Sequence, residues 1–151
     1  MDLILWRHAE AEDGAPDAAR RLTAKGERQA KRMAKWLAER LPEDAILISS
    51  EAARAAQTAR ALRREFETSS ALGVGSDARA ILAAAGWPSS ARKTVVLVGH
   101  QPTLGEAAAL ALGGSAAPWE LKKGALVWLA HRSRGGRAQT VLRAAMSPDL
   151  L

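Results

Sequence analysis

The stretch Thr94-Val95-Val96-Leu97-Val98-Gly99-His100 carries the clearest strand signal in the sequence. Five β-branched or aliphatic residues follow one another without a polar interruption, and a glycine ends the run. Such a run is typical of a strand buried on both faces. Strands of this kind occur in α/β proteins, where helices cover both sides of a parallel sheet. The stretch therefore predicts a central strand of an α/β sheet.

Other apolar runs predict further strands around this one. Leu3-Ile4-Leu5-Trp6 and Ala45-Ile46-Leu47-Ile48 are short and uninterrupted. Near the C-terminus, residues 125–130 and 139–143 bracket Gly135-Gly136, a pattern typical of a hairpin.

Helical spacing of apolar residues fills the segments between these strands. The expected helices span about 23–41, 50–66, 77–85 and 103–113. Thr23 is expected to cap the first of them, and Ser50 is expected to cap the second, which should begin within two residues of it. Residues 9–22 and 68–76 are expected to be loops. This alternation predicts an α/β fold: a three-layer α/β/α sandwich with a mostly parallel central sheet and a C-terminal hairpin.

Length and composition limit the classes of protein that fit. The chain has 151 residues, 48% of them hydrophobic and 25% charged, which is typical of one globular domain over residues 1–151. It has no cysteine, which excludes a disulfide scaffold, a thiolate zinc site and a cysteine nucleophile. No apolar run approaches the ~20 residues of a membrane span, and nothing resembles a signal peptide, so we expect a cytoplasmic protein.

The positive charge is concentrated in the second half of the chain. Residues 1–75 hold 13 basic and 12 acidic side chains, whereas residues 76–151 hold 9 and 4. A basic half could attract phosphate, an acidic protein or nucleic acid. No zinc-finger spacing, aromatic-studded basic strand or long basic tail accompanies the charge, so a nucleic-acid partner is not favoured.

Polar residues follow three of the predicted strands directly. Arg7-His8 follows the first, Ser49-Ser50 the second, with Arg54 in the helix beyond, and His100 the third. Carboxyl ends of parallel strands meet at one edge of a sheet, where ligands bind. We therefore expect two histidines and two arginines to converge there.

This set of side chains is suited to phosphoryl transfer. Arginine donors match phosphate oxygens and neutralise their charge without a metal. A neutral imidazole can attack phosphorus and form a phosphohistidine, while a second histidine donates a hydrogen bond to the phosphoryl group. The remaining histidine, His131, matches no motif. Two placed histidines without an Asp-x-Asp cluster do not favour a two-metal phosphatase, so no cofactor is expected.

Four blocks of the sequence resemble the histidine phosphatase superfamily, and in particular its short SixA-type phosphohistidine phosphatases. They occur in the family's order and are Leu3–Ala11 with Arg7-His8, Arg21–Gly26, Ile48–Ala59 with Arg54, and Val96–Leu104 with Gly99-His100. The resemblance implies that His8 is the nucleophile, that Arg7 and Arg54 grip the phosphate, and that His100 completes the pocket and binds phosphoryl oxygens.

The sequence departs from the family's pattern at two positions. Ala9 stands where a glycine is usual, and its Cβ argues against a positive φ. Glu51 stands where a proline is common, and we expect its carboxylate to point away from the phosphate.

The carboxylates indicate which kind of substrate the site can turn over, because the alcohol of an ester substrate leaves as an alkoxide and needs a proton donor. The candidates for such a donor are Glu10, Glu51 and Asp77, and no spacing argument places any of them. A phosphohistidine substrate relaxes the need, since its imidazole can leave neutral. The resemblance and this scarcity of acids together predict a metal-independent phosphohistidine phosphatase.

Two alternatives stay open. One is a broad phosphomonoesterase acting on small esters, and the other is a non-catalytic phosphate- or phosphoprotein-binding module. The expected partner is a protein that bears phosphohistidine, such as a histidine phosphotransfer domain in signal transduction. We also expect a monomer, inorganic phosphate or sulfate in the site, and no membrane partner.

Overall fold

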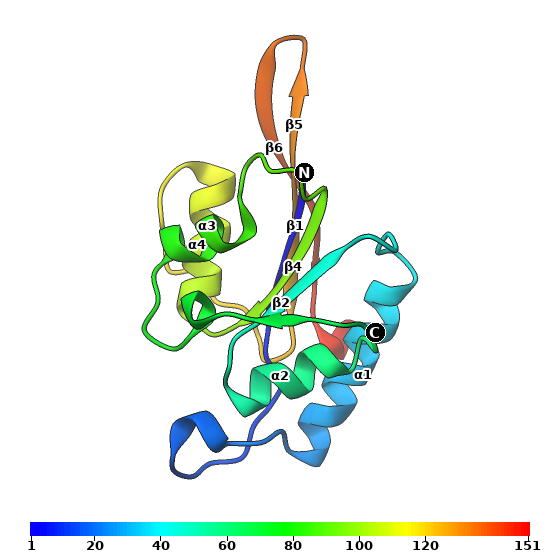
Figure 1. Ribbon diagram of the computed structural model, residues 1–151, viewed down its shortest axis with the longest axis vertical. Helices are drawn as coiled ribbons and strands as arrows, with labels where there is room; N and C mark the ends of the chain where they lie inside the picture. The colour runs from blue at the N-terminus through cyan, green and yellow to red at the C-terminus, as the bar shows by residue number, and fades with distance from the viewer.

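Six strands form one sheet in the computed structural model, which describes residues 1–151 (Figure 1). They are β1 (Asp2–Arg7), β2 (Ile46–Ser49), β3 (Glu67–Thr68), β4 (Thr94–Gly99), β5 (Leu126–Arg134) and β6 (Arg137–Met146). Their order in the sheet is β3-β2-β4-β1-β5-β6. The first four are parallel, and β5 and β6 add an antiparallel hairpin beside β1.

Four helices cover the two faces of this sheet. They are α1 (Ala24–Ala38), α2 (Ala53–Arg60), α3 (Ala78–Ala85) and α4 (Thr103–Gly113). In Figure 1, α3 and α4 lie together on one side of the sheet, and α1 and α2 lie on the other. Three short 3₁₀ helices, η1 (Asp17–Ala19), η2 (Ser70–Leu72) and η3 (Pro148–Leu150), occur in the connections. The predicted α/β sandwich with a mostly parallel sheet and a C-terminal hairpin is confirmed.

The two core layers follow from the alternation of side chains along the strands. In β1, Leu3 and Leu5 pack with α3 and α4, whereas Ile4 and Trp6 pack with α1 and α2. Because helices cover both faces, every residue of β4 is buried. This double burial explains why β1 and β4 are continuous apolar runs in the sequence rather than alternating ones.

The helix caps are only partly as the sequence predicts. Thr23 caps α1, because its side chain accepts a hydrogen bond from Gly26 N. Ser50 does not cap α2, which begins at Ala53, one residue later than expected. Ala52 occupies the N-cap position instead. The Ser50 backbone N–H bonds to Val98 O at 2.9 Å and continues the ladder of β2 and β4, and the Ser50 hydroxyl accepts from Ala52 N, ahead of the helix.

The expected lengths of two helices are also wrong. Helix α1 ends at Ala38, before the turn that leads to Pro42. Helix α2 ends at Arg60 rather than near 66, and the chain takes up a left-handed conformation at Arg63, with φ 53°, which cannot continue a helix. The chain then forms β3 at the edge of the sheet, where the sequence predicts a loop from 68 onward. Two polar residues carry no periodic pattern that reveals a strand.

A close approach of backbone fixes the segment that follows β1. A Cβ added to Gly26 would lie 1.9 Å from the carbonyl oxygen of Glu10, so only glycine lets the first turn of α1 pack on this segment. Gly26 therefore anchors the chain two residues beyond His8.

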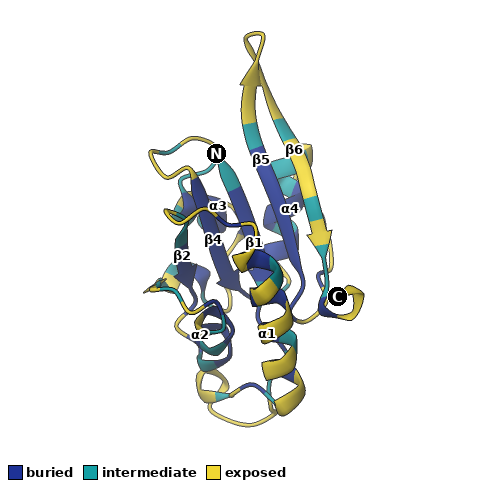
Figure 2. Cartoon of the chain, turned by 90° about the vertical axis from the view of Figure 1, so that its right-hand side faces the viewer, coloured by how far each residue is buried: buried dark blue, intermediate teal, exposed yellow.

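The hairpin of β5 and β6 extends far beyond the rest of the sheet. Figure 2 shows that its outer part is exposed, whereas the lower half of β5 is buried. The hairpin projects from the end of the sheet where β1 begins, since His131 N donates to Met1 O. No helix in the chain has the length and apolar character needed to cross a membrane.

Candidate active site

The carboxyl ends of β1 and β4 bring two histidine rings together. His8 follows β1, and its backbone N–H donates to Gly99 O, the last residue of β4, at 3.0 Å. The ring centroids of His8 and His100 lie 5.2 Å apart. Arg54, from α2, lies against both rings: its Nε donates to His8 Nε2 at 3.3 Å, and its Nη2 lies 3.4 Å from His100 Nδ1. The structure thus brings together three of the four side chains that the strand ends predict.

The hydrogen bonds of His8 determine where its proton sits. Its Nδ1 lies 2.7 Å from the carbonyl oxygen of Ala9, which only accepts hydrogen bonds, so Nδ1 carries the hydrogen. The lone pair is then on Nε2, where Arg54 donates. Burial, reinforced by the nearby positive charges, lowers the pKa of His8 to about 3. At neutral pH the ring is uncharged, with a nucleophilic nitrogen facing Arg54.

His100 is held in the opposite tautomer. The guanidinium of Arg54 can only donate, so Nδ1 of His100 is an acceptor and its Nε2 carries the hydrogen. That Nε2–H donates to Ser50 Oγ at 2.8 Å. Burial, followed by the charge of Arg54, lowers the pKa of His100 to about 4. Ser50 therefore orients His100 and does not cap α2.

Arg7 is at the end of β1, beside His8. Its Nη1 donates to Leu121 O at 2.5 Å, and its buried Nε has no acceptor in the protein. Burial lowers the pKa of Arg7, but the guanidinium stays charged at neutral pH. The buried Nε–H of Arg7 is therefore a donor that the protein itself leaves without an acceptor.

Thr58 connects the segment that follows β1 with helix α2, and the sequence analysis did not identify it. Its hydroxyl accepts from Ala9 N at 3.0 Å and donates to Arg54 O at 2.8 Å. This fully buried side chain ties the residue after His8 to the helix that carries Arg54. Ala9 has no positive φ, as its Cβ predicts. The signal for Thr58 was available, because it is polar and one turn after Arg54 on an otherwise apolar helix face.

Asp17 is the second residue that sequence reasoning missed. It belongs to η1, in the segment expected to be a loop, and its Oδ2 accepts from Arg54 Nη2 at 3.1 Å. No periodicity in residues 9–22 points to this contact.

The three carboxylates considered as proton donors have other surroundings. Glu10 accepts from the Thr23 hydroxyl and lies between Lys25 and Lys123. Asp77 caps α3 by accepting from Ala80 N. Glu51 is exposed, as predicted.

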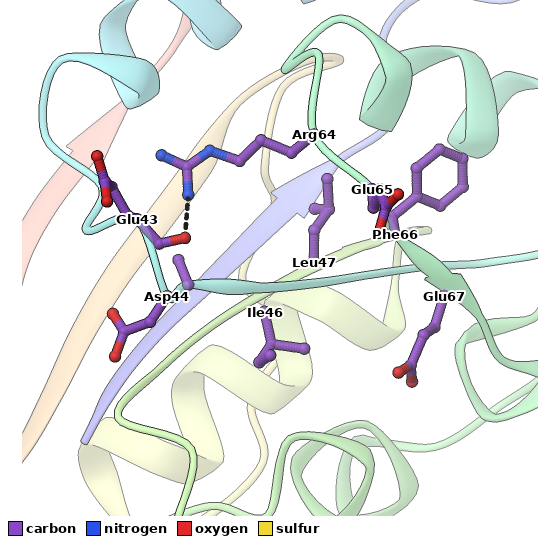
Figure 3. A pocket seen from close by; sticks show the side chains of 9 residues that line it. Glu43, Asp44, Ile46, Leu47, Arg64, Glu65, Phe66 and Glu67 are labelled. Carbon is purple, nitrogen blue, oxygen red and sulfur yellow. Dashed lines mark hydrogen bonds between the residues drawn. The ribbon is translucent and has the colours of Figure 1, made fainter.

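A separate hollow of about 570 Å³ lies at the other end of β2 (Figure 3). It lies between the start of β2 and the segment from Arg64 to Glu67. Arg64 donates across it to the backbone oxygen of Glu43, but the other charged residues around it are acidic. This hollow would repel a phosphoryl group. No cluster of three or more His, Asp or Glu side chains in the chain could hold a metal ion.

Comparisons with known proteins agree with this geometry. The family model of the histidine phosphatase superfamily (branch 1) matches residues 3–73, which include Arg7, His8 and Arg54. An uncharacterised protein of Picosynechococcus sp. is 35% identical over 149 residues, covering 92% of this chain and 89% of that protein.

Solved structures of SixA proteins are similar over almost the whole chain. A candidate phosphohistidine phosphatase SixA from Nakamurella multipartitia is 27% identical with a TM-score of 0.80, covering 97% of this chain and 95% of that one. Its counterpart from Agrobacterium tumefaciens is 27% identical with a TM-score of 0.78, covering 97% of each chain. The protein histidine phosphatase SixA complexed with tungstate shares the fold, with 23% identity, a TM-score of 0.84 and 99% of each chain covered. The family match, together with the two SixA structures that are 27% identical, shows that this chain belongs to the histidine phosphatase superfamily.

Proposed function

We propose that this protein is a metal-independent phosphohistidine phosphatase in which His8 carries the phosphoryl group. One observation carries the proposal: the uncharged His8 ring has its Nδ1–H fixed on the Ala9 carbonyl, and its Nε2 lone pair faces Arg54 and His100. A nucleophile of this kind needs no separate base, because it has no proton to lose before it attacks.

In the first step, His8 Nε2 attacks phosphorus and the bond from phosphorus to the substrate's nitrogen breaks. The bond electrons leave with the substrate imidazole, which departs neutral when its other ring nitrogen carries a proton. Arg7 and Arg54 bind the phosphoryl oxygens and balance the charge that develops on them. His100 lies on the same side and completes the pocket.

In the second step, water attacks the phosphorus of the phosphorylated His8 and releases inorganic phosphate. The Ala9 carbonyl keeps Nδ1 protonated, so the phosphorylated ring carries a positive charge and leaves phosphorus readily. The proton lost by the attacking water goes to the departing phosphate or to solvent. The two arginines supply the positive charge that a metal ion would otherwise provide.

The carboxylates favour a nitrogen-linked substrate over an ester. Glu10 is held by Thr23 and two lysines, Asp77 caps a helix, and Glu51 faces solvent. Hydrogen bonds from Arg20 and Arg54 lower the pKa of Asp17, which makes it a poor proton donor at neutral pH. A phosphohistidine leaving group does not require such a donor, whereas an alkoxide does. The inferred partner is therefore a protein that presents phosphohistidine.

The test compares two substrates of different leaving group. A chemically phosphorylated histidine peptide and p-nitrophenyl phosphate are each incubated with the protein, and phosphate release is measured. We expect kcat/KM for the peptide to exceed that for the ester. Equal or greater turnover of the ester would indicate the broad phosphomonoesterase instead, and binding of phosphate without turnover of either would indicate a binding module.

A further inference from the structure

The guanidinium of Arg54 makes hydrogen bonds to the two histidine rings along one edge and to Asp17 at its other end. One edge, formed by Nε and Nη2, faces the two catalytic-site rings, with Nε 3.3 Å from His8 Nε2 and Nη2 3.4 Å from His100 Nδ1. The other end donates twice to Asp17: Nη1 to the backbone oxygen at 2.9 Å and Nη2 to Oδ2 at 3.1 Å. Arg54 is only 3% exposed, although it is charged.

Asp17 is itself fixed by a second arginine. Arg20, on the same short turn, donates to Asp17 Oδ1 from Nε at 3.0 Å and from Nη2 at 2.9 Å. Arg20 Nη1 donates in turn to the carbonyl of Glu12 at 3.0 Å. Each carboxylate oxygen of Asp17 thus serves one arginine, which lowers the pKa of Asp17 and keeps it charged.

We propose that Asp17 is a positioning residue that aims Arg54 at the phosphoryl group; this rests on the function proposed above. An arginine side chain has many rotamers, but a guanidinium held at one end by a carbonyl and a carboxylate keeps a single plane. The opposite edge, which bonds the rings of His8 and His100 in this structure, is then aimed at the site, where two phosphoryl oxygens would replace the ring nitrogens as its acceptors in a bidentate manner. Asp17 acts through Arg54 and does not touch the substrate.

The position of Asp17 favours this role over a direct chemical one. Its carboxylate lies on the far end of the guanidinium from His8, and its low pKa disfavours proton donation. The side chain is 57% exposed, so removing it opens no cavity in the core. A role limited to anchoring residues 9–22 would change stability but not the way in which Arg54 binds an anion.

The test is a double-mutant cycle with Asp17→Ala and Arg54→Ala. The measurements are kcat/KM on the phosphohistidine peptide, the dissociation constant of tungstate by calorimetry, and Tm. We expect Asp17→Ala to lower kcat/KM and tungstate affinity by about 10- to 100-fold, because small misplacement of a binding group costs this much. In the Arg54→Ala background the same change should cost less than about twofold, because the residue through which Asp17 acts is gone.

Two further variants separate geometry from charge. Asp17→Asn keeps one acceptor oxygen for Arg54 Nη2 but cannot also serve Arg20, so we expect it to restore part of the loss. Asp13→Ala removes one exposed carboxylate of the same segment that has no partner in the protein, and it should leave all three measurements unchanged.

The outcomes distinguish this inference from the proposed function. Tungstate binding reports on the anion pocket whether or not the peptide is a substrate, so absent peptide turnover alone overturns the proposed function. The positioning role is overturned if Asp17→Ala binds tungstate and turns over peptide within twofold of the wild type. It is also overturned if Asp17→Ala costs as much without Arg54 as with it, since Asp17 would then act by another route.

Discussion

Arginines at the two ends of the sheet differ in burial and in partners. Arg54, at the carboxyl end of the strands, is 3% exposed and contacts Asp17, His8 and His100. Arg134 and Arg137, at the tip of the β5–β6 hairpin, are exposed and make no ion pair or side-chain hydrogen bond. The hairpin holds much of the charge excess of residues 76–151, whereas two of the arginines of the site come from residues 1–75. Net charge therefore does not mark the candidate site, whereas a buried arginine with several hydrogen-bond partners does.

The physical reason is the cost of burying a charge. A guanidinium out of water is tolerated only when its N–H groups find acceptors and its charge a counter-charge. Arg54 finds both, and its partners are the residues that a phosphoryl-transfer site requires. The exposed arginines of the hairpin are solvated by water and require no acceptor or counter-charge from the protein. Their presence in the sequence therefore does not point to a binding site.

Between the two ends of the sheet, the largest difference in the effect of a substitution on turnover is expected for the histidines. His8→Ala should abolish turnover of every phosphorylated substrate, because it removes the ring nitrogen that is proposed to accept the phosphoryl group. His131→Ala, at the base of the hairpin, is the matched control and should leave kcat/KM within about twofold of the wild type, since this half-buried ring packs on Trp87 at the opposite end of the sheet from His8. Steady-state phosphate release from both variants is the measurement. Full activity of His8→Ala would contradict the proposed role of His8 and remove the difference between the two ends of the sheet.

A second, smaller difference is expected for His100. His100→Ala removes a buried ring whose Nδ1 accepts from Arg54, and we expect the loss of this preorganised support to cost about 10²–10³ in rate. Ser50→Ala should reproduce a part of this loss, because His100 Nε2–H donates to the Ser50 hydroxyl. Single-turnover rates of both variants on the peptide test this order. A Ser50→Ala protein slower than His100→Ala would contradict the role of Ser50 as a support for His100.

The two buried histidines should also make stability depend on pH. Their pKa values are about 3 and about 4 in the folded protein, against 6.5 in the unfolded chain, so the unfolded state binds more protons between these values. The free energy of unfolding should therefore fall as the pH drops from about 6.5 toward 4. Tm measured across this range checks it, and a His8→Asn, His100→Asn double variant should show a flatter curve. An unchanged slope in the double variant would assign the pH dependence to other groups.

The smallest effect is expected at the hairpin tip. Arg134→Ala and Arg137→Ala, singly or together, should change the free energy of unfolding by less than about 0.5 kcal/mol. They should also leave kcat/KM on the peptide within twofold. A larger loss with an intact protein partner, but not with the peptide, would sharpen the comparison by showing that the hairpin helps to dock that partner.

The sequence predicts the strand ends of the site well because their signals are local. An uninterrupted apolar run followed by a polar residue places His8 and His100, and the topology of parallel strands brings them together. The start of α2 was misjudged because Ser50 has two possible uses, as a helix cap or as a hydrogen-bond partner of His100. Only the fold shows which of them applies.

Asp17 and Thr58 could not be placed in the same way. Asp17 lies in an irregular segment without periodicity, and its contact with Arg54 spans 37 positions of sequence. Thr58 is one turn beyond Arg54, but its tie to Ala9 depends on where β1 ends relative to α2. The side chains that support the candidate site depend on packing between segments, whereas the positions of the two proposed reacting histidines follow from the strand ends.

Trapping the phosphorylated enzyme tests the central claim most directly. The protein is mixed with a radiolabelled phosphohistidine peptide and quenched within one turnover, and the labelled peptide of the digest is identified. The account predicts label on the peptide that contains His8, in a linkage that is labile to acid and stable to base, as a bond from phosphorus to nitrogen is. Acid-stable phosphoserine at Ser49 or Ser50, or phosphate release with no label on His8 at any time, would contradict it.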